Sequence, residues 1–472
     1  MKEDLNMYGN ELTYATTLWT IGYALGQIPS NLILTRVPPR YWIPMLELAW
    51  GFCTLASCRV QTTHQLYFIR FFVGLFEAGF YPAAQYLLGS FYKPRELGKR
   101  AVLFHCMGAV GSMLSFVLAA ATYTGLNGVR GLEGWRWLFV IDAVISEPGV
   151  SPPAARTPHA VTALTPNPAL RHCTALPVAT LGILFLPSLP GQPSFQPTFW
   201  LSPDDLALIQ SRMASIGRAP AGTLSFTKVR SYTKNWHVFL LPALYVVWNN
   251  GGGASGILLL WLKAQREDGR PKYSVPEINH LSMPVSAVGA LGGIVAGWMS
   301  DGPLRGRRWP MMVAFTLINT ALCVTLLVLP VYEHVSAHFV LYYLTGLTSG
   351  LSGLYFAWAN EICSNDNEER ALVVVLMNDL AYVVQAIVPN FVWKTVDYPK
   401  ATKGLNYSIL LNLSVTPLVL LIRHLQQRES RLALAVDEGT ETETLLADGM
   451  GGAHGKAVEG ERGETGEMEG GW

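Results

Sequence analysis

The sequence consists of apolar runs, each about as long as a membrane span, separated by short polar loops. The run 102–123 contains no acidic or basic residue apart from one histidine, His105. About 20 residues of α-helix cross the ~30 Å hydrocarbon core of a bilayer. Lipid offers no hydrogen bond to the backbone, so a spanning segment is a helix or part of a closed barrel. Because the runs are continuous rather than alternating, the sequence predicts an all-α polytopic membrane protein surrounded by lipid.

The composition excludes several other classes of protein. Charged residues make up 14% of the chain, against about 25% in soluble proteins. The formal net charge of +1 does not favour binding to nucleic acid. The six cysteines form no Cys-x-x-Cys pair and are typical of small buried apolar residues. The sequence shows no cluster of metal ligands, no glycine-rich phosphate loop and no nucleophile with an evident base, so we expect neither an enzyme nor a cofactor.

The apolar runs predict ten complete spans and one divided span. The complete ones are 13–35, 41–58, 65–90, 101–123, 237–262, 280–300, 309–330, 338–359, 371–394 and 405–424. The runs 135–146 and 176–186 are each too short to cross a bilayer, but joined they are long enough for one span. Inside the bilayer, the polar segment between them, 147–175, would leave backbone N–H and C=O groups without hydrogen-bond partners. It is therefore either an insert foreign to the fold or a loop between two half-helices.

These runs predict four parts of the chain. Residues 1–186 form an N-terminal bundle, 187–236 a central cytosolic loop, 237–428 a C-terminal bundle, and 429–472 a disordered tail rich in Gly, Glu and Thr. Ser202 and Pro203 are typical of a helix start, so the loop should contain a helix from there to about Ile216. The loops with clustered Lys and Arg, near 93–100 and 305–308, should face the cytosol, as expected of a multi-pass protein of the plasma membrane.

A loop near residue 300 resembles the loop signature of major facilitator transporters, which is a Gly, then an Asp, then a turn rich in Gly and Arg. A Gly at this place allows two helices to approach closely, and the Asp can pair with a base and hold one conformation. The alternative is an ordinary basic cytosolic loop. A weaker copy lies at 34–40, with Thr35 where the family usually has Asp. The predicted conformational latch consists of Gly297, Asp301, Arg305, Arg307, Arg308, Arg36 and Arg40.

Further segments narrow the resemblance within the same family. Arg70 followed by Gly74 is similar to the family's fourth-helix motif. The segments 9–14, 26–32, 35–44, 134–139 and 358–361 resemble the anion:cation symporter branch, and within it the fungal pantothenate and vitamin–proton symporters. The resemblance implies a major facilitator fold of two helical bundles that rock around a midplane site. About eleven spans are present, and the family's first helix, which would complete six plus six, has no counterpart.

Ionisable side chains inside spans are costly and are candidates for function. Glu77 lies seven residues after Arg70, on the same helix face. We expect Glu77 to carry a proton, with Arg70 either as its charge partner or as a carboxylate binder. The alternative is a structural ion pair, or an arginine reaching the interface. Asp142 and Asp379 are further candidates for proton coupling, and Asp142 is equally compatible with a role in helix packing.

Polar residues at helical spacing predict a substrate site. Asn378, Tyr382 and Gln385 share one helix face, which lines a cavity or hydrogen-bonds another helix. Three glycines after Asn249 and Asn250 should weaken their span, either to expose these amides to substrate or simply to bend the helix. Tyr81 and Arg70 complete the predicted set. The stripe from Thr16 to Gln27 is assigned to packing in preference to binding, and His105 either to a proton relay or to a hydrogen-bonded core.

The sequence therefore predicts a secondary transporter that imports a small organic anion with a proton. Pantothenate or a related vitamin is the expected substrate, as the resemblance implies. A permease for another carboxylate, such as allantoate, biotin or nicotinate, is the alternative within the same class. A nutrient sensor that does not transport, or an inactive truncated product, is the alternative outside it.

Overall fold

A computed structural model describes residues 1, 4–7, 11–34, 37–146, 178–187, 201–215, 226–267, 270–393 and 400–460. The predicted insert 147–175 and the latch residue Arg36 lie outside these residues. The described chain is almost entirely helical, as predicted, apart from a short antiparallel ribbon of β1 (Arg266–Glu267) and β2 (Arg270–Pro271). Within these described ranges, five unbroken helices are long and apolar enough to cross a membrane by themselves, at 96–125, 277–301, 309–328, 367–387 and 402–432.

The first bundle contains seven described helices. They are α1 (Glu11–Leu34), α2 (Pro39–Ser57), α3 (Thr63–Glu77), α4 (Phe80–Phe91), α5 (Pro94–Gly125), α6 (Gly134–Ser146) and α9 (Val178–Phe185). The run 65–90 was predicted as one helix, but it divides into α3 and α4. Pro82 explains the division, because it has no N–H to donate to the carbonyl of Ala78 and its ring crowds that carbonyl. The break leaves Glu77 at the end of α3.

The second bundle contains helices that are broken at glycines. It comprises α12 (His237–Gly251), α13 (Ile257–Ala264), α14 (Val275–Asp301), α15 (Trp309–Val328), α16 (Val335–Thr345), α17 (Ser352–Ile362), α18 (Asn367–Ile387), α19 (Pro389–Val392) and the start of α20 (Thr402–Gly460). The 3-10 turns η2 (Gly252–Gly256) and η3 (Gly346–Leu351) join α12 to α13 and α16 to α17. The weakening predicted at the three glycines of span 237–262 is therefore confirmed.

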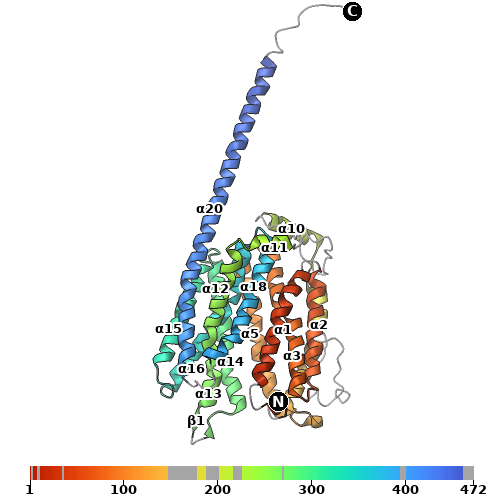
Figure 1. Ribbon diagram of the computed structural model, residues 1–472, viewed down its shortest axis with the longest axis vertical. Helices are drawn as coiled ribbons and strands as arrows, with labels where there is room; N and C mark the ends of the chain where they lie inside the picture. Colours follow the sequence, from red (N-terminus) through yellow and green to blue (C-terminus); the bar gives the residue numbers. More distant parts are fainter. Residues whose placement is uncertain are drawn as a thin grey trace, which may run out of the picture. The chain divides into compact units, whose positions relative to one another are not determined.

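The two bundles meet along a few long helices. α5 packs along α14 and α17, and α1 packs along α18. In Figure 1, α5 and α18 lie between the group of α1, α2 and α3 and the group of α14, α15 and α16. Helices from opposite ends of the sequence therefore line the boundary between the two bundles.

The central segment and the end of the chain hold helices of their own. α10 (Pro203–Ala214) starts where the sequence predicts, since Ser202 Oγ accepts a hydrogen bond from the Asp205 N–H, 3.1 Å away. α11 (Phe226–Tyr232) leads into α12. α20 continues to Gly460, whereas a disordered tail was expected from 429. The Ala, Leu and Glu residues between 432 and 447 are strong helix formers and favour the helix there, whereas the five glycines from 449 to 460 do not.

Candidate functional site

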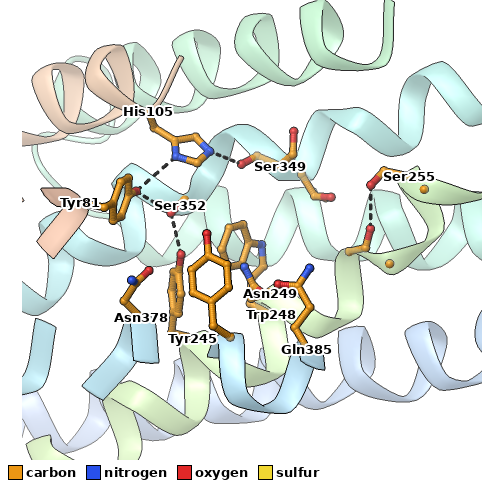
Figure 2. A pocket seen from close by; sticks show the side chains of 15 residues that line it. Tyr81, His105, Tyr245, Trp248, Asn249, Ser255, Ser349, Ser352, Asn378 and Gln385 are labelled. Carbon is orange, nitrogen blue, oxygen red and sulfur yellow. Dashed lines mark hydrogen bonds between the residues drawn. The ribbon is translucent and has the colours of Figure 1, made fainter. Parts of the chain in front are cut away.

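A cavity of about 400 Å³ lies between the two bundles (Figure 2). This volume is within the range of small-molecule sites. α4 and α5 of the first bundle form one part of its wall, and α12, η2, η3, α17 and α18 of the second bundle form the rest. Five of the seven predicted substrate-binding residues line it, namely Tyr81, Asn249, Asn378, Tyr382 and Gln385.

The other two predicted substrate-binding residues lie elsewhere. The Asn250 side chain is buried and donates to the carbonyls of Val246, 3.0 Å away, and Ala381, 3.5 Å away, so it joins α12 to α18. Arg70 is not among the residues lining the cavity. Its guanidinium carbon lies 5.8 Å from the centre of the Phe139 ring, and it makes no ion pair with Glu77 within the described chain. The structure therefore does not bring Arg70 to the cavity with the other five.

The broken helix at η2 creates room on one side of the cavity. A Cβ atom added to Gly252 or Gly256 would meet nothing within 4 Å, so both positions border open space. The neighbouring Asn249 amide has a buried Oδ1 that accepts no hydrogen bond from the described residues. Because a buried polar atom without a partner is costly, this amide is well placed to bind a polar ligand.

A chain of hydrogen bonds crosses the cavity wall from one bundle to the other (Figure 2). Tyr81 Oη lies 3.2 Å from His105 Nδ1 and 3.0 Å from Ser352 Oγ. Ser352 Oγ lies 2.8 Å from Tyr245 Oη, and His105 Nε2 lies 2.8 Å from the carbonyl oxygen of Ser349. Sequence reasoning missed Tyr245 and Ser352. The position of Tyr245 three and four residues before Trp248 and Asn249 was the available signal.

Glu77 lies one layer behind the cavity wall. Its Oε2 accepts a hydrogen bond from Trp19 Nε1, 3.0 Å away. The Trp19 ring stacks on Tyr23 at 5.1 Å and meets Tyr382, a lining residue, at 6.0 Å. Tyr23 Oη in turn accepts a hydrogen bond of 3.0 Å from Asn378 Nδ2. The aromatic stripe on α1 thus packs, as predicted, and it also connects Glu77 to two residues that line the cavity.

The other two predicted proton carriers do not line the cavity. Asp379 is buried on α18 beside Asn378, and its Oδ1 accepts no hydrogen bond from the residues that the structure describes. Asp142 is half-buried on α6. Glu77 is therefore connected to two lining residues through Trp19 and Tyr23, and the two aspartates lie in separate surroundings.

The predicted latch is built around a buried ion pair at one end of the bundles. Arg308 pairs with Asp301, and both side chains are fully buried. Arg308 Nη2 also lies 2.6 Å from Glu361 Oε1, and Arg308 Nη1 donates to Ser300 Oγ at 2.9 Å. These four residues all belong to the second bundle.

Asp301 also joins the second bundle to the first. Its Oδ2 accepts a hydrogen bond of 2.7 Å from the backbone N–H of Lys99, near the start of α5. An acid is stabilised near the N-terminal end of a helix by the positive end of the helix dipole. A Cβ atom at Gly98 would lie 2.2 Å from Arg308 Nη1, so a larger residue there would displace this guanidinium. At the predicted latch residue Gly297, a Cβ would come within 3.3 Å of Val102 on α5.

The remaining latch residues do not take part in this contact. The side chains of Arg305 and Arg307 are exposed. Arg40 lies in the first bundle, where its Nε donates to the carbonyl of Ile183 at 2.8 Å, so it holds α2 against α9. The weaker first-half copy of the signature therefore contributes packing within its own bundle in the part that the structure describes.

A second contact between the bundles was missed from the sequence. Arg370, in the first turn of α18, is 1% exposed. It donates to the carbonyl of Gly89 and to Ser90 Oγ, both 3.1 Å away, and lies 4.7 Å from the centre of the Tyr86 ring. A cation is stabilised at the C-terminal end of a helix, which here is the end of α4. The hairpin of α4 and α5 is thus held at both of its helix ends by opposite charges from the second bundle.

Replacing Arg370 with Met is expected to open this end of the bundles. The variant removes two charge-assisted hydrogen bonds, each worth about 1.5–3 kcal/mol. The ratio of molecules closed at this end to molecules open at it should therefore fall by about tenfold or more. A cysteine at Gln385 should then react at least about tenfold faster with an impermeant thiol reagent added from that face. Exposed Arg307→Met is the matched control. An unchanged reaction rate in Arg370→Met would show that Arg370 does not hold this end closed.

Comparisons with known proteins agree with this architecture. A family profile described as Major Facilitator Superfamily matches residues 1–389. The pantothenate transporter liz1 of Schizosaccharomyces pombe is 28% identical over 95% of this chain and 80% of its own length. The pantothenate transporter FEN2 of Saccharomyces cerevisiae is 31% identical over 91% of this chain and 78% of its own length. The crystal structure of the human organic anion transporter MFSD10 shares the fold, with a TM-score of 0.55 at 12% identity over 89% of this chain and 87% of its own.

Proposed function

Because the chain belongs to the Major Facilitator Superfamily, whose members are membrane transporters rather than enzymes, we propose that it imports a small organic anion together with a proton. Pantothenate is the proposed substrate, and the plasma membrane the proposed location. The observation that carries the proposal is the cavity of about 400 Å³ whose polar lining comes from both bundles. The two relatives named as pantothenate transporters support the choice of substrate.

The contacts between the bundles support transport by alternating access. Asp301 and Arg370 close one end of the structure through hydrogen bonds to the hairpin of α4 and α5. Both contacts join one bundle to the other, so a rocking motion that separates the bundles at this end would break both. The cavity lies between the same two bundles, so the motion would change the side from which it is reached.

The cavity offers neutral hydrogen-bond donors rather than fixed positive charge for a carboxylate. Its described lining includes the amides of Asn249 and Gln385 and the hydroxyl of Tyr382. His105 is the one lining residue, among those described, that can gain a positive charge at physiological pH. We therefore assign carboxylate binding to these polar groups, with Arg70 supporting the first bundle from outside the cavity.

Replacing Asn249 or Gln385 with Ala is expected to raise the half-saturating concentration of pantothenate by about tenfold or more. A hydrogen bond to a charged group is worth about 1.5–3 kcal/mol, and loss of one corresponds to this change. Uptake of labelled pantothenate into vesicles measures it, with nicotinate and allantoate as competing anions. Ser414→Ala is the control, because this half-buried hydroxyl on α20 bonds the Leu410 carbonyl of its own helix and does not line the cavity. Unchanged half-saturation in both cavity variants would place the substrate elsewhere.

Biotin is a second candidate substrate. A protein of Saccharomyces cerevisiae named vitamin H transporter is 28% identical over 87% of this chain and 64% of its own length. Biotin also carries one carboxylate on an otherwise uncharged body, so the same cavity chemistry applies to it. Competition between labelled pantothenate and biotin in the vesicle assay distinguishes the two.

A further inference from the structure

The hydrogen-bond chain that begins at His105 and ends at Tyr245 has a defined direction. A carbonyl oxygen only accepts hydrogen bonds, so His105 Nε2, 2.8 Å from the Ser349 carbonyl, must carry a hydrogen. In the neutral ring, Nδ1 is then the acceptor. Tyr81 must therefore donate to His105 across 3.2 Å. The neutral histidine thus sets the direction of every hydroxyl that follows.

The remaining hydroxyls align behind Tyr81. With its hydrogen directed at His105, Tyr81 accepts from Ser352 at 3.0 Å and from Gln85 Nε2 at 3.3 Å. Ser352 then accepts from Tyr245, 2.8 Å away. The hydrogen of Tyr245 is consequently used inside the wall, and its oxygen can offer only lone pairs to the cavity that it lines.

One added proton reverses the whole chain. When Nδ1 is protonated, both ring nitrogens are donors, and Tyr81 must accept from His105. Tyr81 then donates to Ser352, and Ser352 donates to Tyr245. Each oxygen keeps its own hydrogen and only O–H bonds rotate, so the one proton taken from solution remains on His105. Tyr245 is left with a hydrogen that Ser352 no longer accepts and that a ligand in the cavity can accept.

We propose that His105 is a proton-binding site that switches Tyr245 from an acceptor to a donor toward the bound anion. The inference rests on the proposed function and assigns the coupling between proton and anion to named atoms. The protonated state offers the carboxylate a new hydrogen-bond donor and a nearby positive charge. By thermodynamic reciprocity, a bound carboxylate increases the affinity of His105 for the proton by the same factor.

The surroundings of His105 contain few competing charges. The ring borders the central cavity and a second cavity of about 650 Å³, and Tyr81 and Ser349 line both. The titratable groups among the described residues of the two linings are Tyr81 from α4, Tyr245 from α12 and Tyr382 from α18, all uncharged at neutral pH. α14 and η3 present Ser286 and Ser349 there. The direction of the hydrogen bonds from His105 to Tyr245 therefore depends on the proton at His105.

The switch is also linked to the motion of the bundles. His105 and Tyr81 belong to the first bundle, and Ser349, Ser352 and Tyr245 belong to the second. Two of the hydrogen bonds cross between them, the contact of Tyr81 with Ser352 and the contact of His105 with the Ser349 carbonyl. Rocking that separates the bundles would free Nε2 of His105 and break the link from Tyr81 to Ser352, and the proton could then leave on the other side.

Equilibrium binding of labelled pantothenate to the purified full chain tests the proposal at pH 5.5 and pH 8.0. We expect about tenfold tighter binding at pH 5.5, within the range of 5- to 150-fold typical of coupled sites. His105→Gln should reduce the ratio to below twofold. Tyr245→Phe, which leaves His105 intact, should reduce it to below threefold. The same ratios should hold in a Glu77→Gln background, which separates this switch from the proton carrier proposed at Glu77.

Three controls decide the result. Tyr355→Phe removes a buried hydroxyl that is not part of the hydrogen-bond chain from His105 to Tyr245, and it should keep the tenfold ratio. Pantothenol, the neutral alcohol analogue, should bind equally at both pH values. Nitrogen NMR of labelled histidine should find Nδ1 of His105 without hydrogen at pH 8.0. A full ratio in His105→Gln, or hydrogen on Nδ1 at pH 8.0, would overturn the proposal. Absence of pantothenate binding at both pH values would refute the substrate instead, leaving the NMR result to judge the switch.

Discussion

Glu77→Gln is expected to abolish accumulation of substrate driven by a proton gradient, while exchange of substrate across the membrane continues. A charged carboxylate on an apolar helix costs several kcal/mol if it is unpaired, so it suits a group that binds and releases a proton. Gln resembles the protonated carboxyl permanently. Its carbonyl oxygen still accepts the hydrogen bond from Trp19 Nε1, now 3.0 Å from Glu77, so the link to the cavity wall remains intact.

Paired measurements in vesicles test this expectation. Uptake under an imposed proton gradient should fall to background, and counterflow with substrate on both sides should keep at least about half of the parent rate. Glu333→Gln, an exposed position, makes the same chemical change elsewhere and should transport normally. If Glu77→Gln still accumulates substrate with full pH dependence, Glu77 is structural and Asp379 or Asp142 becomes the candidate.

Asp301→Asn is expected to lower the maximal transport rate by about 100-fold with a much smaller effect on substrate affinity. Breaking a buried ion pair costs about 3–5 kcal/mol, and Asp301 and Arg308 are both fully buried. The substitution also weakens the bond from the N–H of Lys99, which joins the bundles. The residue does not line the cavity, so the substitution should lower the stability of the closed arrangement more than it lowers the affinity for substrate.

Transport rates and binding constants measured on the same preparation separate the two effects. Arg305→Gln, an exposed change in the same loop, is the control and should stay within about twofold of the parent. A large loss of affinity with an unchanged maximal rate would contradict the assignment of Asp301 as a latch. Chromatography of the purified variants in detergent verifies that the compared chains are folded.

Local chemistry allowed part of the site to be predicted. Asn378, Tyr382 and Gln385 were identified because polar residues at helical spacing in an apolar run must face something other than lipid. A weakened helix was predicted from consecutive glycines, and the 3-10 turn η2 that the structure has there borders the cavity. Asn250 shows the limit of this reasoning. It is adjacent to Asn249, but the helix turns about 100° per residue and directs its amide to α18 instead.

The sequence by itself determined that this chain crosses a membrane many times as helices, because lipid neither solvates charges nor satisfies a bare backbone. It also identified the loop that contains Asp301 as the predicted latch, because this acid and three arginines lie together between two apolar runs. The tertiary structure alone decided which distant residues meet. The N–H of Lys99 reaches Asp301, Arg370 reaches the end of α4, and Tyr81 reaches Ser352. These contacts span about 200 to 280 residues of sequence, and helical periodicity contains no information on partners so far apart. Only the packing of the two bundles brings opposite charges to the ends of one hairpin and lines up the hydroxyls between His105 and the cavity.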